Sequence, residues 1–144
     1  MRGARLAIVA ALLAAQACSG LQFVDHDEVV FTFPPDRSTV ALPVLIEWDA
    51  KEIATGQGFA VFIDRSPQPP GMTIDEAFDL DDRGGIVLSD RPELVLEQLA
   101  IRGGVPERDR DRHELTVVIL DGEGRRVGEF ADVLELLVDR SRRD

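Results

Sequence analysis

The sequence predicts an all-β protein, a Greek-key β-sandwich of about seven strands formed by residues 29–138. Short apolar runs recur along the chain and are separated by glycine, proline and aspartate at intervals of about 8–12 residues. Several runs alternate apolar and polar side chains with a period of two, which is the period of a half-buried strand. The chain has 144 residues, and the 127 that follow position 17 are enough for one domain with a buried core but not for two.

The first two expected strands lie on either side of a proline-rich turn. Val29–Phe33 ends at Pro34, because proline cannot donate to a strand ladder. Val40–Asp49 then forms a second strand, half-buried because its apolar side chains alternate. The residues expected on its inner face are Val44, Ile46 and Trp48.

The middle of the chain contains both clear and ambiguous segments. Phe59–Ile63 is apolar on both faces, which predicts a central strand, and the proline-rich Pro67–Gly71 predicts an extended loop. Ile86–Leu88 is expected to be a short strand. The pattern leaves strand and helix open for residues 72–80 and 93–101.

The last two expected strands form a hairpin. His113–Leu120 and Arg126–Val138 are joined by Asp121–Gly124, whose Asp-Gly pair is typical of hairpin turns. The polar connector 102–112 is expected to be a solvated loop, and residues 139–144 form a charged tail.

Three stretches resemble bacterial immunoglobulin-like and fibronectin type III-like modules. They are PPDRSTVALPVLIEW at 34–48, GFAVFID at 58–64 and HELTVVILDGEG at 113–124. The resemblance implies an Ig-like sandwich. The composition of the chain excludes the antibody-type branch of this fold. One cysteine cannot form an intersheet disulfide, and a chain without tyrosine has no tyrosine corner.

The amino terminus has the three regions of a secretory signal peptide at residues 1–17. A short cationic stretch precedes the apolar run Leu6–Ala15, and Ala15–Ala17 is a small-x-small cleavage site. The apolar run has ten residues, whereas a membrane-spanning helix needs about 20. We therefore expect a cleaved signal rather than a retained anchor.

Cys18, the only cysteine, follows the cleavage site directly, which resembles the lipobox of bacterial lipoproteins. The resemblance implies that Cys18 carries diacylglycerol and a fatty acyl group such as palmitate, and that residues 18–28 form a lipidated acidic tether. The chain would then be anchored to the cell membrane or the outer membrane, facing the periplasm or the exterior. Ser19 resembles the outer-membrane sorting pattern, although inner and outer membrane both stay open. Simple secretion after cleavage at Ala17 is the alternative.

The charge of the chain excludes one class of partner. The sequence has 16 basic and 27 acidic side chains, a net charge of −11. Residues 1–17 contain two arginines and no acid, so the remaining residues have 14 basic and 27 acidic side chains, a net charge of −13. Such a surface repels nucleic acid, and we expect no nucleic-acid partner.

The sequence contains no recognisable catalytic motif. His113 and Glu114 open like the zinc-protease HExxH, but Val117 replaces the second histidine. We therefore expect His113 to be a polar residue at a strand edge. No Gly-x-Ser-x-Gly motif surrounds a serine, and no catalytic residue is predicted.

One acidic segment is a weak candidate for Ca²⁺, which binds six to eight oxygen ligands. Its candidate ligands are Asp75, Asp79, Asp81 and Asp82. Arg83 stands where a further ligand would be needed, so a solvated acidic loop is the favoured interpretation and no cofactor is expected.

Aromatic side chains are too few at exposed positions to predict a sugar-binding platform. Phe78 is expected to be exposed, Phe23 and Phe130 are left open, and the other aromatic residues sit at core-like strand positions. These core-like residues are Phe31, Phe33, Trp48, Phe59 and Phe62.

The sequence thus predicts a non-enzymatic envelope lipoprotein whose Ig-like module binds another envelope protein, through a sheet edge or the Pro67–Gly71 loop. A Ca²⁺-dependent ligand- or carbohydrate-binding sandwich is the alternative, and a small secreted hydrolase is the third.

Overall fold

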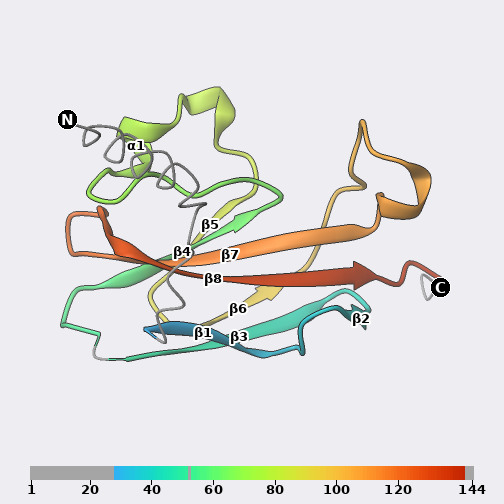
Figure 1. The fold of residues 1–144 in the computed structure, drawn as a ribbon, viewed down its shortest axis with the longest axis horizontal. Helices are drawn as coiled ribbons and strands as arrows, with labels where there is room; N and C mark the ends of the chain where they lie inside the picture. Colours follow the sequence, from blue (N-terminus) through green and yellow to red (C-terminus); the bar gives the residue numbers. More distant parts are fainter. Residues whose placement is uncertain (1–27, 52, 142–144) are drawn as a thin grey trace, which may run out of the picture.

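Two β-sheets make up almost the whole of the computed structural model, which describes residues 28–51 and 53–141 (Figure 1). The all-β prediction is confirmed. The strands are β1 Val29–Phe33, β2 Ser38–Val40, β3 Val44–Ala50, β4 Gly58–Ile63, β5 Ile86–Ser89, β6 Glu93–Leu96, β7 Arg112–Leu120 and β8 Arg126–Val138. Three short helical segments accompany them: α1 Ile74–Ala77, and the 3₁₀ turns η1 Leu80–Asp82 and η2 Glu107–Asp109. No helix in these ranges is long and apolar enough to cross a membrane.

The strand order is that of an Ig-like Greek-key sandwich. One sheet has the order β1-β3-β6 and the other β2-β8-β7-β4-β5. The chain changes sheet at β1–β2, β2–β3, β3–β4, β5–β6 and β6–β7. Every neighbouring pair is antiparallel except β2 and β8. Crossing connections of this kind interlock the two sheets around one core.

The core between the sheets is built around Trp48. Its ring packs edge-on against Phe59 at 5.2 Å between centroids and against Phe31 at 6.2 Å. Val44, Ile46 and Trp48 are all buried, as the alternation in β3 predicts. β4 is buried on both faces between β5 and β7, which confirms its predicted central position. Each large apolar side chain buried in this way stabilises the fold by about 1.5–3 kcal/mol.

The predicted strand Val40–Asp49 is wrong at its start, which accounts for the eighth strand. Val40 belongs to β2, which pairs with β8 in the opposite sheet. Pro43 lies between β2 and β3 and has no N–H to donate, so the ladder cannot continue through it. Leaving β1 at Phe33, the chain therefore crosses to the second sheet for three residues and returns as β3.

The two ambiguous segments adopt different structures. Residues 72–80 contain α1, whose Thr73 and Glu76 form a capping box at its start. Residues 93–101 contain the strand β6 only as far as Leu96. Beyond it, Leu99 is buried in the core without belonging to a strand.

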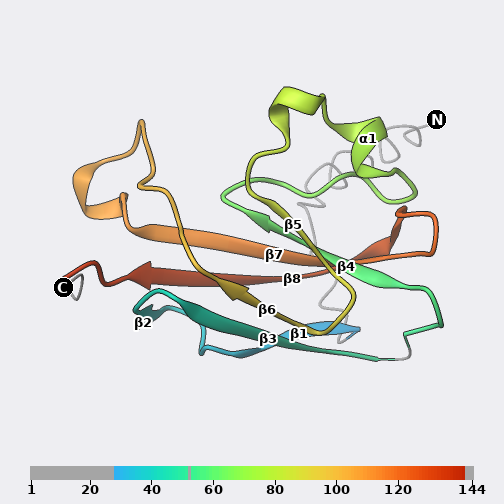
Figure 2. The same cartoon turned by 180° about the vertical axis from the view of Figure 1, so that it is seen from behind.

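Residues 64–85, between β4 and β5, cover part of the outer face of the five-stranded sheet, whereas Leu88, Val133 and Leu137 on that face are exposed. Phe78 and Ile74 pack there against Phe62 and its neighbours in a second apolar cluster, and Arg65 stacks over the Phe78 ring at 4.4 Å. The prediction of an exposed Phe78 is therefore wrong: its ring is half-buried. Figures 1 and 2 show this segment on one side of the sandwich, while β1 and β3 lie on the opposite side.

Candidate functional site

The outer face of the three-stranded sheet is not covered by any described element, and we call it the open face. Its apolar members are Val30, Phe33, Leu45 and Val95, and its acidic members are Glu47, Asp49 and Glu93. The period-two alternation of β3 and β6 directs these side chains outward while their neighbours enter the core. In Figure 1 no coloured element lies below β1 and β3.

Strand register places these side chains next to one another. Leu45 lies opposite Val95, and both Phe33 and Glu93 lie opposite Glu47, on its two sides. Side chains at directly opposed positions share one face and approach to about 5 Å. The four apolar members are 38% to 54% exposed, so they form an accessible group rather than scattered residues. The sequence pattern placed Phe33 in the core, which is wrong, because an irregularity between Phe31 and Phe33 turns Phe33 outward.

The acidic side chains of the open face lack an ion-pair partner among residues 28–51 and 53–141. The strands β1, β3 and β6 contain no lysine or arginine, and none of the three carboxylates forms an ion pair with a described residue. Glu47 and Glu93 are directly opposed, an arrangement that destabilises a sheet. Elsewhere in the domain several acids are paired with arginine, as in Arg125–Glu76 at 2.8 Å and Arg112–Glu135 at 2.7 Å.

The four aspartates proposed as weak Ca²⁺ ligands lie in the covering segment and point to different partners. Asp75 pairs with Arg83 at 2.6 Å, and Asp82 pairs with Arg65 at 3.2 Å. Asp79 precedes η1, and Asp81 is exposed within it. Among residues 28–51 and 53–141, no three His, Cys, Asp or Glu side chains converge on a possible metal position.

His113, expected from the sequence to be a polar residue at a strand edge, is buried in the five-stranded sheet. It is 1% exposed and lies in β7, between β4 and β8. Its Nδ1 lies 2.7 Å from Asp64 Oδ2 and donates to it, because a carboxylate can only accept. Its buried Nε2 has no hydrogen-bond partner in the described part of the chain.

Asp64 closes the end of the β4–β7 ladder. Its Oδ1 accepts the Glu114 N–H at 3.0 Å, and its own N–H donates to the Glu114 carbonyl at 2.8 Å. Burial of the Asp64 carboxyl acts to raise its pKa, but the hydrogen bonds from His113 and Glu114 and the charge of Arg102 outweigh burial and lower the pKa below 3.8. Asp64 is therefore an ionised anchor for the buried imidazole.

A cleft of about 630 Å³ lies along the flank of the sandwich where β5 and β6 do not pair. Its residues are Ile63, Asp64, Gly84, Gly85, Ile86, Val87, Val95, Leu96, Glu97, Gln98, Leu99, Ala100 and His113. A histidine held by an aspartate is the orienting half of a hydrolase triad, but a triad also needs a nucleophile. The described residues that line this cleft include no serine, threonine or cysteine. Through its bonds to His113 and the Glu114 N–H, Asp64 ties the imidazole to the strand ladder.

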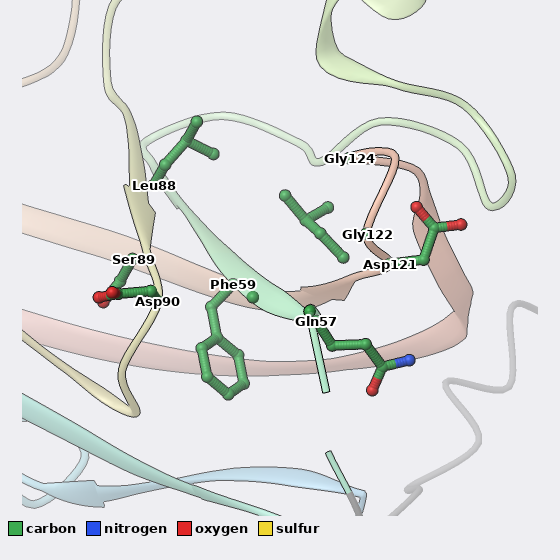
Figure 3. Close-up of a pocket in the computed structure, with 11 residues that line it drawn as sticks. Gln57, Phe59, Leu88, Ser89, Asp90, Asp121, Gly122 and Gly124 are labelled. Atoms are coloured by element: carbon green, nitrogen blue, oxygen red, sulfur yellow. The ribbon is translucent and has the colours of Figure 1, made fainter. Parts of the chain in front are cut away.

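A second groove, of about 570 Å³, lies where three connections meet at one end of the sandwich (Figure 3). It is lined by Gly56, Gln57, Gly58, Phe59, Leu88, Ser89, Asp90, Leu120, Asp121, Gly122 and Gly124. Asp121 is the first residue of the predicted hairpin turn, and its Oδ1 accepts hydrogen bonds from the N–H groups of Glu123 and Arg125, both at 2.9 Å. The turn is confirmed, and the carboxylate is used in holding it.

The Pro67–Gly71 loop is attached to the sandwich. Gln68 is fully buried, its carbonyl accepts from Arg126 at 2.8 Å, and the Gly71 N–H donates to the Arg126 carbonyl at 2.8 Å. Its exposed residues are Pro69, Pro70 and Gly71. The signal peptide 1–17, Cys18 and most of the tether lie outside the described residues, as do residues 142–144 of the tail.

Comparison with known proteins gives one structural likeness. No family model matches the chain, and no curated protein matches it. A solved structure of the fibronectin(III)-like modules of CbhA from Clostridium thermocellum is similar at 17% identity and a TM-score of 0.46, over 79% of this chain and 99% of that one. The fold assignment itself rests on the strand order described above.

Proposed function

We propose that the chain is a non-enzymatic lipoprotein of the bacterial cell envelope, whose Ig-like domain binds another envelope protein through the open face. One observation carries the proposal: residues 64–85 pack on the outer face of the five-stranded sheet, whereas no described element packs on the open face, which exposes four apolar side chains next to three carboxylates. Exposed apolar groups rimmed by charge are typical of protein interaction sites.

The composition of the open face supports a protein partner. Phe33 provides an aromatic side chain of the kind that is enriched at interfaces, and Leu45 and Val95 extend the apolar centre. Of the four apolar members, only Val95 also lines one of the two concave sites, and small molecules bind in concave sites. The face as a whole therefore suits another protein better than a small molecule.

A lipid anchor at Cys18 fits this role. The ten residues from Ser19 to Glu28 span at most about 35 Å when fully extended. The domain would therefore stay close to the membrane and meet partners held at the same surface, which raises their effective concentration.

The absence of an assembled nucleophile beside His113 favours a binding role over the hydrolase alternative. In one groove His113 is bonded to Asp64, and in the other the carboxylate of Asp121 is bonded to its own turn.

Two substitutions test the proposal in the full chain. Cys18→Ser removes the acylated sulfur, so the protein should leave the membrane fraction, and unchanged detergent partitioning would contradict the anchor. A photoreactive residue at position 45 in intact cells should capture a discrete partner, whereas position 137, a leucine of similar exposure on β8, should not. Equal capture at the two positions would contradict the open face as the binding surface.

A further inference from the structure

We infer that the surface of the partner that binds the open face is cationic. It carries arginine or lysine side chains around an apolar contact. The inference rests on the proposed function and adds the chemistry of the partner.

The arginines of the described ranges all lie outside β1, β3 and β6. Several of them pair with carboxylates of the other sheet or its covering segment, as in Arg83–Asp75 and Arg112–Glu135. The strands β1, β3 and β6 hold three acidic side chains and no basic one, while Lys51 follows β3 and Arg91 precedes β6. Because the domain as a whole is acidic, its field reinforces this local potential and attracts a basic partner.

The register of β3 and β6 supplies a second argument. Glu47 and Glu93 repel each other across the strands, and a glutamine at either position would relieve the repulsion without changing the shape of the sheet. A guanidinium or ammonium group seated between them would turn this repulsion into attraction. Such a group would lie next to Phe33, whose ring face also attracts cations.

The geometry separates two parts of the interface. Leu45 and Val95 form an apolar pair at one end of the face, and Glu47 with Glu93 forms the charged row beside it. Apolar contacts determine how tightly such an interface holds, and charges determine partner choice and salt dependence. The partner should thus carry its cations beside an apolar side chain rather than as an isolated basic tail. A second copy of this chain would present acid against acid.

The experiment uses the full chain with a photoreactive residue at position 95, in membranes isolated from the producing cells. The yield of the crosslinked product is measured in four backgrounds: unchanged, E47Q/E93Q, D81N/E107Q and L45R. Asp81 and Glu107 are exposed, lie off the open face and form no ion pair with a described residue, so their double variant changes the net charge equally and serves as the control.

We expect E47Q/E93Q to lower the yield about threefold to tenfold and to weaken its salt dependence, and D81N/E107Q to leave both unchanged. E47Q/E93Q should melt no lower than the unchanged protein, because it removes a repulsion, so a loss of product is not a loss of fold. If L45R abolishes the product while E47Q/E93Q keeps the full yield, the open face binds but the partner is not cationic, and the inference is overturned. If no background gives product above that from position 137, the proposed function itself fails.

Discussion

Replacing Asp64 by asparagine tests the interpretation of the buried His113 as a structural residue. Asp64 has a backbone φ of 56°, in the left-handed region that asparagine adopts readily. The substitution therefore adds no backbone strain and removes only the charge and one of two acceptor oxygens.

The expected cost follows from the hydrogen bonds at this position. The carboxylate accepts from His113 Nδ1 and from the Glu114 N–H, whereas an amide has one acceptor oxygen and would turn its NH₂ group toward the other donor. Losing a hydrogen bond to a charged group costs about 1.5–3 kcal/mol, and here a buried donor is left unpaired. We expect D64N to lower the free energy of unfolding by about 2–3 kcal/mol at neutral pH.

The effect should depend on pH in a defined direction. The pKa of Asp64 is lower in the folded than in the unfolded chain, so its stabilisation is complete above the unfolded value of about 3.9 and is lost as pH falls through the folded value. The difference between the unchanged protein and D64N should therefore narrow below about pH 4.

Urea unfolding followed by Trp48 fluorescence measures the free energy of unfolding of each variant. Measurements at about pH 7 and about pH 3 give both the cost of D64N at neutral pH and its decrease in acid. D81N is the matched control, since exposed Asp81 has no ion-pair partner among the described residues, and it should change stability by less than about 0.5 kcal/mol. If D64N behaves like D81N at neutral pH, or if its cost is unchanged in acid, the structural role given to the His113–Asp64 pair is wrong.

Two further predictions concern the segment that covers the five-stranded sheet. Gly85→Ala should destabilise the protein by at least about 1 kcal/mol in thermal unfolding, because Gly85 has a φ of 75° and an added Cβ would lie 2.8 Å from the Ile63 carbonyl oxygen. Gly84→Ala, which meets nothing within 4 Å, should be close to neutral, and equal effects would contradict the packing at Gly85. The melting temperature should be the same in millimolar Ca²⁺ and in a chelator, because Asp75 and Asp82 are paired with arginines. A higher melting temperature in Ca²⁺ would support the metal hypothesis again.

The sequence was informative where one local pattern determined the structure. Alternation in β3 and the fully apolar β4 predicted which side chains enter the core, and the Asp-Gly turn predicted the last hairpin. The start of β3 was harder to predict, because Val40 and Val44 are the same residue type and both fit a strand. Only Pro43, which has no N–H for the ladder, indicates that the chain changes sheet between them.

The candidate site was not predicted, because it depends on contacts between distant residues. Phe33 reads as a core residue until the irregularity in β1 turns it outward, and Phe78 reads as exposed until Phe62 is placed beneath it. His113 lacks a nearby sequence partner, since Asp64 is 49 positions away. Glu47 and Glu93 are opposed because of the register between β3 and β6, which the sequence does not show. The sequence shows only that neither strand contains a basic residue.

Cysteine accessibility in intact cells tests the binding role of the open face most directly. Leu45 and Leu137 are 38% and 39% exposed, so L45C and L137C in the full chain should react equally with a small water-soluble maleimide once the protein is purified. In cells, we predict that L45C reacts much more slowly than L137C, because the partner covers the open face. Equal labelling in cells would contradict the proposal that this face is bound.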